Sequence, residues 1–277
     1  MKKIAITGPS GLVGSRIIEL LSSDFAFIPL PQEELDITDA EQVNQKFKTL
    51  DADLLLHLAA YTNVDGAETN KEMARSINVE GTRNLFTAAT KKTMQFVYIS
   101  TDFVFDGDHP PYDESSVPNP IGYYGQTKYE GEQVVKDAAM VVRITYPYRK
   151  SYEARPDFMR SIKRLLSEGK TIGGITDSTF TPTFIDDIAY GLKHLMNHYS
   201  PEIYHLVGSA SMSPYEAFVA IAQTFGLDES LIVKTTYDEY FKGKAKRPRN
   251  GQTISTKNTF QKMRDFTQGL SDISSSA

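Results

Sequence analysis

The chain contains no cysteine and no long apolar stretch. Without cysteine there is no disulfide bond, no thiolate metal ligand and no cysteine nucleophile, and this composition is typical of a reducing compartment. No segment approaches the roughly 20 consecutive apolar residues of a membrane-spanning helix. The apolar run after Lys2 and Lys3 ends at Gly8, which is too short for the core of a signal peptide. We therefore expect a cytoplasmic protein that does not contact a membrane.

The chain also lacks a strong charge of either sign. Its 30 basic and 35 acidic side chains give a formal net charge of −5, so we expect no general attraction to nucleic acid. The 277 residues have an ordinary globular composition, with 40% hydrophobic and 23% charged residues. This length allows one large domain, or one domain with a smaller lobe, around a hydrophobic core.

Short apolar runs alternate with segments of helical periodicity along the N-terminal half. Strands are predicted at residues 4–7, 25–30, 53–59, 96–100, 140–145 and 203–207. Helices are predicted at residues 12–22, 40–50, 71–90, 123–136, 158–168, 186–197 and 214–225. Strands that are apolar on both faces and separated by helices indicate a parallel sheet covered on both sides. The predicted fold class is therefore α/β, with a Rossmann-type doubly wound parallel sheet.

The regularity changes after residue 145. Residues 171–183 are interpreted as a loop, residues 242–250 form a basic segment broken by Pro248, and residues 274–277 are expected to be disordered. We predict a dinucleotide-binding domain at 1–145, completed by about 184–207. Residues 146–183 and 208–277 would form a smaller mixed C-terminal lobe that binds the substrate.

Three glycines at regular spacing, Gly8, Gly11 and Gly14, follow the first strand and open the first helix. Glycines at such a turn allow a tight bend, a close approach of pyrophosphate to backbone N–H groups, and close packing of helix on strand. The free N–H groups and the dipole at the helix start favour an anion. We therefore predict a dinucleotide site that also includes residues of the turn and the first helical turn: Ser10, Leu12 and Val13.

The choice between NAD(H) and NADP(H) stays open. The second strand ends at residues 28–32 without the carboxylate that usually binds the adenosine ribose, and without a cation for a 2′-phosphate. Glu33, Glu34 and Asp36 follow shortly and weigh slightly against NADP. Asp36 and Ile37 either flank the adenine, or Asp36 only turns the chain before the next helix.

Tyr124 and Lys128 are four residues apart on a predicted helix, so their side chains share one face. A free tyrosine has a pKa of about 10 and is a poor acid–base catalyst at neutral pH. A nearby ammonium group and an oxidised nicotinamide would both lower that pKa. Ser100, Thr101 and Asp102 end a strand upstream, at the sheet edge where ligands bind in open α/β sheets. A hydroxyl there can donate to a ketone oxygen, and the set indicates carbonyl reduction.

These residues lie in longer strings that resemble the extended short-chain dehydrogenase/reductases, and within them the dTDP-4-dehydrorhamnose reductase (RmlD-like) family. The most specific strings are Ala-Ala-Tyr-Thr-Asn-Val-Asp at 59–65 and Ser-Thr-Asp-Phe-Val-Phe-Asp-Gly at 100–107. Further matching strings stand at 7–14, 78–85, 111–114 and 124–132, and weaker similarity continues at 177–183, 203–208 and 247–257.

The resemblance implies roles for individual residues. Thr101, Tyr124 and Lys128 would form the catalytic triad, and Asn78 would keep its helix shaped for a water relay to the lysine. Ala59, Ala60 and Tyr61 would line the nicotinamide-ribose side of the cofactor. Other residues expected to bind the cofactor are Leu58, Ser100, Tyr124 and Lys128. Asp102 and Phe103 would face the sugar. For Asn78 the alternative is a helix-interior asparagine bonding its neighbours, and for Tyr61 it is aromatic packing.

The implied reaction is hydride transfer from NADH or NADPH to the C4 ketone of a nucleotide-linked 6-deoxy-4-keto sugar. Two other classes stay open. One is a non-catalytic cofactor-binding regulatory subunit resembling that of methionine adenosyltransferase, and the other is a sugar-nucleotide epimerase or dehydratase. A dehydratase would want a glutamate where Phe103 stands, so we rank it lower. Homodimer formation is left open, because no pattern in the chain encodes an oligomeric state.

The C-terminal part departs from the family. The usual Arg-Pro-x-Asn-Ser-x-Leu-Asp string reads Arg-Pro-Arg-Asn-Gly-Gln-Thr-Ile at 247–254, and no tryptophan follows the strand that holds Arg143. We predict that Arg247, which keeps the family match, binds a substrate phosphate. No metal site is predicted, because His194 and His198 are four apart without a carboxylate motif and are expected on a helix surface.

Overall fold

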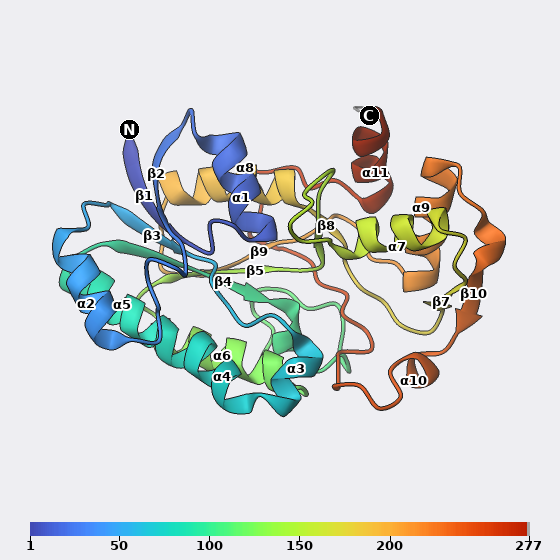
Figure 1. Ribbon diagram of the computed structural model, residues 1–277, viewed down its shortest axis with the longest axis horizontal. Coiled ribbons are helices and arrows are strands. Elements are labelled where there is room, and N and C mark those ends of the chain that lie inside the picture. Colours follow the sequence, from blue (N-terminus) through green and yellow to red (C-terminus); the bar gives the residue numbers. More distant parts are fainter. Residues whose placement is uncertain (276–277) are drawn as a thin grey trace.

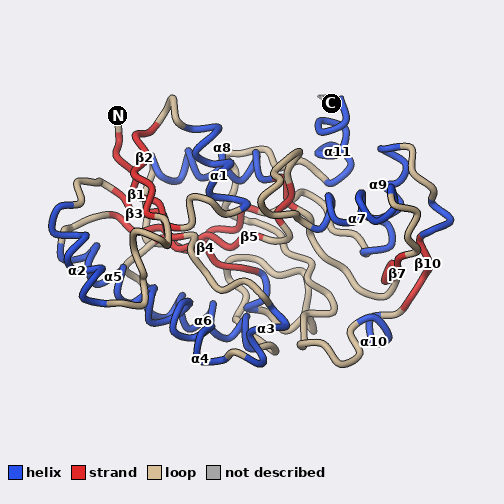
Figure 2. The backbone as a smooth tube through the Cα atoms, in the orientation of Figure 1, coloured by secondary structure: helices blue, strands red, loops and turns tan. Residues whose placement is uncertain are grey.

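The computed structural model describes residues 1–275 and places a six-stranded sheet at its centre (Figures 1 and 2). The strands are β1 (Lys2–Thr7), β2 (Phe25–Leu30), β3 (Leu54–His57), β4 (Gln95–Thr101), β5 (Met140–Ile144) and β9 (Ile203–Leu206). Their order is β2-β1-β3-β4-β5-β9, and all neighbouring pairs are parallel. The order reverses between β1 and β3, so the predicted doubly wound α/β sheet is confirmed.

Helices cover both faces of the sheet (Figure 1). Helices α1 (Leu12–Leu21) and α8 (Ile185–Asn197) pack on one face, and α2 (Ala40–Thr49), α5 (Thr82–Lys91) and α6 (Tyr123–Val135) on the other. Successive side chains of a strand point to opposite faces. Accordingly, Ile4 and Ile6 belong to the core under α1 and α8, while Ala5 belongs to the core under α2 and α5.

The helix predicted at 71–90 is interrupted. After α3 (Val64–Thr69) the chain forms α4 (Lys71–Arg75), then a π-helical turn at Ser76–Gly81, and only then α5. Asn78 lies inside the π-helical turn, and its buried side chain bonds the backbone of Tyr61. Such π-helical turns commonly mark functional sites. Periodicity alone could not predict this interruption, because the partner lies in another segment.

The C-terminal lobe lies to the right in Figure 1. Its buried side chains form a core of their own. It contains α7 (Phe158–Ser167), α9 (Pro214–Phe225), α10 (Tyr237–Tyr240) and α11 (Phe266–Ser275). Two short parallel pairs complete it, β6 (Pro147–Tyr148) with β8 (Thr183–Phe184), and β7 (Ile172–Ile175) with β10 (Ile232–Thr235). The domain boundaries that we predict from the sequence stay predictions.

Two expectations for this lobe are wrong. Residues 171–183, interpreted as a loop, contain β7 and the start of β8. Gly173 and Gly174 hide β7 in the sequence, because a glycine has no side chain to add to the apolar pattern of a strand. Residues 274 and 275, expected to be disordered, belong to α11, whereas residues 276 and 277 lie outside the described part of the chain.

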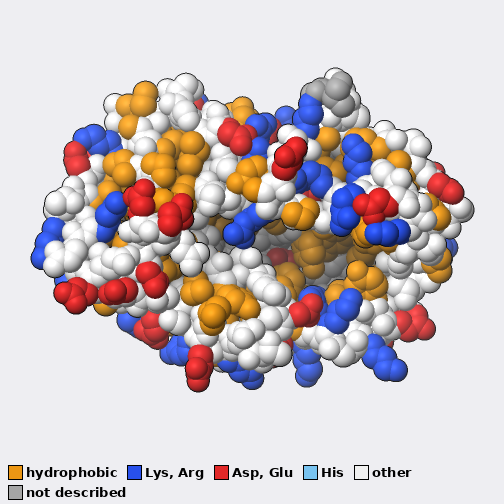
Figure 3. Space-filling model, viewed as in Figure 1, with side chains coloured by type: hydrophobic (Ala, Val, Ile, Leu, Met, Phe, Trp, Pro, Cys, Tyr) orange, Lys and Arg blue, Asp and Glu red, His pale blue; other side chains and the backbone are white. Residues whose placement is uncertain are grey.

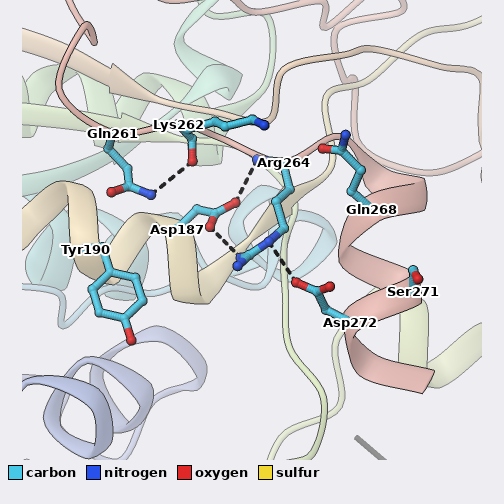
Figure 4. Close-up of a pocket in the computed structure, with 8 residues that line it drawn as sticks. All are labelled: Asp187, Tyr190, Gln261, Lys262, Arg264, Gln268, Ser271 and Asp272. Carbon is cyan, nitrogen blue, oxygen red and sulfur yellow. Dashed lines mark hydrogen bonds and ion pairs between the residues drawn. The ribbon is translucent and has the colours of Figure 1, made fainter. Parts of the chain in front are cut away.

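An ion-pair network joins the lobe to the sheet (Figure 4). The carboxylate of Asp187 on α8 is almost fully buried, and it accepts hydrogen bonds from the backbone N–H and from Nη1 of Arg264, at 2.7 and 2.6 Å. Nε of Arg264 also pairs with Asp272 on α11 at 2.8 Å. The network therefore connects α11 of the lobe to α8, which packs on the central sheet. Within residues 1–275, no helix is long and apolar enough to cross a membrane.

Candidate active site

A cavity of about 950 Å³ opens at the carboxyl ends of the sheet strands, and the visible face of the molecule is hollowed at its centre (Figure 3). It lies at the switch point between β1 and β3, where doubly wound sheets bind their ligands. Most predicted site residues line it, namely Gly8, Ser10, Gly11, Leu12, Val13, Gly14, Asp36, Ile37, Leu58, Ala59, Ala60, Ser100, Thr101, Asp102, Phe103, Tyr124 and Lys128. Tyr61, Asn78 and Arg247 are not among the lining residues.

The glycine turn is held in a conformation that larger residues would disturb. Gly8 has a φ of +65°, in the left-handed region that favours glycine. Its carbonyl oxygen accepts a hydrogen bond from the N–H of Gly11 at 3.0 Å. A Cβ on Gly14 would lie 2.3 Å from that same oxygen, so only glycine lets α1 start this close to β1. No side chain of the described residues caps the start of α1, which leaves its N–H groups facing the cavity free for an anion.

Replacing Gly14 by alanine is expected to weaken dinucleotide binding by about tenfold or more, because the added methyl group would push α1 away from the turn. Binding is measured by titration with NADH or NADPH, alongside the melting temperature. Gly11→Ala provides a graded comparison, since its Cβ would lie 3.1 Å from the same oxygen. This substitution should therefore weaken dinucleotide binding less than Gly14→Ala does. Equal affinity of the wild type and Gly14→Ala would contradict a tight pyrophosphate turn.

A buried histidine connects the first strand to the loop after β3. The Oγ1 atom of Thr7 accepts from the N–H groups of Leu58 and Ala59, and it lies 2.8 Å from Nδ1 of His57. Nε2 of His57 lies 3.0 Å from Oγ1 of Thr82. Burial, aided by the charge of Lys128, lowers the pKa of His57 to about 3, so the ring is neutral. This chain of bonds explains why β3 ends at His57, since the next residues bond Thr7 and form the cavity wall.

Asn78 extends this network to the helix that carries Tyr124. Its Oδ1 accepts from the N–H of Tyr61 at 2.8 Å, and its Nδ2 donates to the carbonyl of Tyr61 and to Oγ1 of Thr127. The hydroxyl of Thr127 donates in turn to the carbonyl of Tyr124 at 2.9 Å. The side chain therefore bonds two other segments rather than its neighbours in its own helix. It fixes the backbone of the loop at Tyr61 relative to α6.

Thr101 and Asp102 are buried together at the end of β4. The hydroxyl of Thr101 donates to Oδ1 of Asp102 at 3.0 Å. Burial raises the pKa of Asp102 to about 7, although the hydrogen bond from Thr101 opposes the rise. The ring of Phe103, the next residue, contacts the ring of Tyr124 edge-on at 5.6 Å. The carboxyl group of Asp102 is thus poised to change charge near neutral pH.

Asp102 should make stability depend on pH. An unfolded aspartate titrates at about 3.9, so between about pH 4 and pH 7 the folded protein holds a proton that the unfolded chain has lost. The contribution of Asp102 to the free energy of unfolding therefore falls as pH rises through this window. Asp102→Asn removes that fall. Denaturant unfolding at about pH 5 and pH 7 measures this effect. From pH 5 to pH 7 the free energy of unfolding of the variant should rise relative to that of the wild type. A difference between the two proteins that does not change with pH would contradict the raised pKa.

The phenol of Tyr124 is buried against these groups. Burial raises its pKa well above the usual range, the charge of Asp102 adds to the rise, and a hydrogen bond with Thr101 opposes it. The expected lowering of this pKa by Lys128 is not seen, because the ammonium group is bonded elsewhere and burial dominates. A protonated phenol is the form that donates a proton.

Lys128 is buried one helical turn from Tyr124. Its Nζ donates to the carbonyl of Ile99 at 2.8 Å and lies 4.1 Å from the centre of the Tyr98 ring. Burial lowers its pKa to about 7, and the charge of Glu132 opposes this shift. The amine therefore exchanges between its charged and neutral forms near neutral pH.

The cavity fits a dinucleotide on two observations. The glycine turn is a cradle that a Cβ at Gly14 would fill. In addition, the hydroxyl of Ser100 lines the cavity and is buried without a hydrogen-bond partner among residues 1–275. A buried polar group without a partner is costly, and a polar ligand in the cavity could satisfy it.

Asp36 lies in the loop between β2 and α2. Its Oδ1 accepts from the N–H and the hydroxyl of Thr38, at 2.9 and 2.7 Å, so it shapes the local turn. It also lines the cavity, together with Gln32. Both interpretations of Asp36 thus have a geometric basis.

The structure does not bring Arg247 to the cavity wall. Its Nη2 pairs with Asp65 at 2.9 Å, its Nη1 donates to the carbonyl of Ala245, and its guanidinium lies 4.7 Å from the ring centre of Phe241. Its role as a phosphate ligand stays a prediction. His194 near the end of α8 stacks at 4.2 Å on His198, which follows the last residue of that helix, and no group of three or more side chains that could hold a metal ion occurs within residues 1–275.

The sequence analysis missed several lining residues, among them Tyr146 and Arg155. Tyr146 has a φ of +34°, which is uncommon for a residue other than glycine, and its ring packs on Phe103 and Phe180. Its position two residues after the end of β5 could have pointed to the site, since ligands bind at the carboxyl ends of strands. Arg155 comes from a loop that no local pattern connects with the cavity.

The parallel sheet, the glycine turn and the Thr-Tyr-Lys set define an extended short-chain dehydrogenase/reductase. The chain belongs to the family described as "RmlD substrate binding domain", which matches residues 1–276.

Solved and curated proteins agree with this membership. The crystal structure of dTDP-4-dehydrorhamnose reductase from Bacillus anthracis in complex with NADP has a TM-score of 0.92 and 31% identity, covering 100% of both chains. The probable low-salt glycan biosynthesis reductase Agl14 of Haloferax volcanii is 30% identical over 82% of this chain and 81% of its own. Methionine adenosyltransferase 2 subunit beta of Bos taurus is 29% identical over 91% of this chain and 80% of its own.

Proposed function

We propose that this protein uses NADH or NADPH to reduce the C4 ketone of a nucleotide-linked 6-deoxy-4-keto sugar, as a dTDP-4-dehydrorhamnose reductase does. One observation carries the proposal: Thr101, Tyr124 and Lys128 line the same cavity as the glycine turn. The relative from Bacillus anthracis carries that enzyme name and was solved with NADP. The cofactor would lie along the turn, with Ser100 and Ala59 beside its nicotinamide half.

When bound, the reduced nicotinamide supplies a hydride to the ketone carbon. Negative charge then develops on the ketone oxygen, and residues of the chain stabilise and protonate that oxygen. Thr101 lies at the strand end, and its hydroxyl can turn its single proton from Asp102 to that oxygen. Tyr124 supplies the proton that turns the alkoxide into the alcohol product, which matches the protonated state that burial imposes on its phenol. Lys128 would hold the nicotinamide ribose and support the return of a proton to Tyr124.

Positioning falls to the buried network around Asn78. It fixes the loop at Tyr61 relative to the backbone of Tyr124 through Thr127, so the cofactor wall and the catalytic helix move as one. Asn78 is in this proposal a positioning residue that also shapes the π-helical turn. Rigid placement of the proton donor is what such reactions need, because small displacements of reacting groups cost large factors in rate.

A regulatory subunit is the second candidate, since the relative from Bos taurus is named as a subunit of methionine adenosyltransferase. The buried triad favours the enzyme. Oxidation of NADH and NADPH against a panel of nucleotide 4-keto sugars tests the proposal directly. Turnover with a dTDP-linked sugar is expected, and tight cofactor binding without any oxidation would favour the regulatory reading. Homodimer formation and a cytoplasmic location stay predictions, the first tested by analytical ultracentrifugation.

A further inference from the structure

A loop from the C-terminal lobe reaches across to the glycine turn. We call residues 149–157, between β6 and α7, the strap. The hydroxyl of Tyr152 in the strap donates to the carbonyl of Ser10 at 2.7 Å. At the start of the strap, the guanidinium of Arg149 bonds Ser15 at 3.0 Å and Glu19 at 2.6 Å, both on α1. The strap therefore contacts the turn and the helix that follows it.

The backbone of the strap is held from its other side. Arg160 on α7 donates through Nη2 to the carbonyl of Arg155 at 2.6 Å and through Nη1 to the carbonyl of Tyr152. Its Nε pairs with the carboxylate of Asp157 at 2.9 Å, and that carboxylate also caps α7. These bonds fix the backbone on which Arg155 stands, while the side chain of Arg155 is exposed and lines the cavity.

The charge of the cavity makes Arg155 stand out. Among the described residues that line it, the cations are Lys128 and Arg155, and the acids are Asp36 and Asp102. Lys128 is buried and bonded to the carbonyl of Ile99, so it belongs to the catalytic end. The glycine turn itself offers N–H groups but no charge. A pyrophosphate is a strong anion, and an arginine binds phosphate oxygens with two parallel hydrogen bonds.

We propose that Arg155, which the strap holds beside the glycine turn, binds the pyrophosphate of the dinucleotide. This inference rests on the proposed function, because it requires a dinucleotide in the cavity. The pyrophosphate is favoured over a ribose 2′-phosphate, since the strap contacts the turn at Ser10, whereas the 2′-phosphate would lie toward the end of β2 near Gln32.

Binding of NADH and of NADPH to the purified full-length protein tests the assignment by isothermal titration calorimetry. Arg155→Ala is expected to weaken both dinucleotides by a similar factor of about tenfold, as for loss of a charge-assisted hydrogen bond. Arg155→Lys should recover part of the affinity for both. Arg164→Ala is the matched control, since this arginine on α7 is exposed and pairs with Glu168, and its affinities should equal those of the wild type. Melting temperatures show whether each variant is folded.

Three results would overturn the assignment. A loss confined to NADPH would place Arg155 at the 2′-phosphate. Unchanged affinity of Arg155→Ala for both dinucleotides would show that Arg155 does not bind the cofactor. In that case a raised KM of the variant for the sugar nucleotide would assign Arg155 to the substrate site. If the wild type itself binds neither dinucleotide, the proposed function fails together with this inference, which is a different outcome from a wild type that binds and a variant that binds equally well.

Discussion

Replacing Tyr124 by phenylalanine is expected to lower kcat by about 10²–10⁴-fold, the range that a general acid contributes. The change removes one hydroxyl from a buried ring and leaves the contact with Phe103 in place. Since Tyr124 donates the proton to the new alcohol, its loss should affect the chemical step rather than binding. Single-turnover oxidation of NADH or NADPH with the sugar substrate measures that step, and titration measures cofactor affinity.

Tyr123→Phe is the matched control for this experiment. Tyr123 precedes Tyr124 on α6, is half-buried and does not line the cavity. Its substitution should leave both kcat and cofactor affinity close to those of the wild type. Near-normal reduction by Tyr124→Phe would refute the mechanism. A loss of cofactor affinity as large as the loss of rate would instead make Tyr124 a residue of the binding site.

The sheet could be predicted from the sequence because its strands are buried on both faces. Runs such as residues 54–56 are apolar at every position, and each is separated from the next by a helix of clear periodicity. The ends of elements were less predictable. The strand predicted to reach residue 59 stops at His57, because the N–H groups of Leu58 and Ala59 bond Thr7, which lies 51 and 52 residues earlier.

The site could be predicted where its residues follow strands or share a helix face. Thr101 ends β4, and Tyr124 and Lys128 are one turn apart on α6, so local rules were enough to bring them together. Arg155 and Tyr146 could not be found in this way. Their place at the cavity depends on how the strap and the end of β5 pass between the two cores, and no local spacing encodes that path.

A buried ion pair between α6 and β5 is expected to contribute strongly to stability. Nε and Nη2 of Arg143 on β5 donate to the two carboxylate oxygens of Glu132 on α6, at 2.9 and 2.7 Å. Their side chains are 1% and 3% exposed. The guanidinium also lies 5.1 Å from the ring centre of Phe105 and close to His205, whose pKa burial lowers to about 4, so the histidine is neutral and cannot replace the carboxylate.

Glu132→Ala should therefore leave a buried cation without its partner and lower the free energy of unfolding by about 3–5 kcal/mol. A fall of roughly 10 °C in melting temperature is expected. Replacing both members by apolar residues, Glu132→Leu with Arg143→Met, should recover most of the loss. Glu168→Ala breaks the exposed pair with Arg164 and should change the melting temperature little.

Removing the charge of Glu132 should also change the pKa of Lys128. Glu132 lies one turn beyond Lys128 on α6, and its negative charge opposes the lowering of the pKa of Lys128 by burial. A folded double variant should therefore hold Lys128 neutral to a lower pH than the wild type does. The pH profile of kcat/KM should shift its lysine-dependent limb toward acid, and an unmoved limb in a stable double variant would mean that Glu132 acts only on the fold.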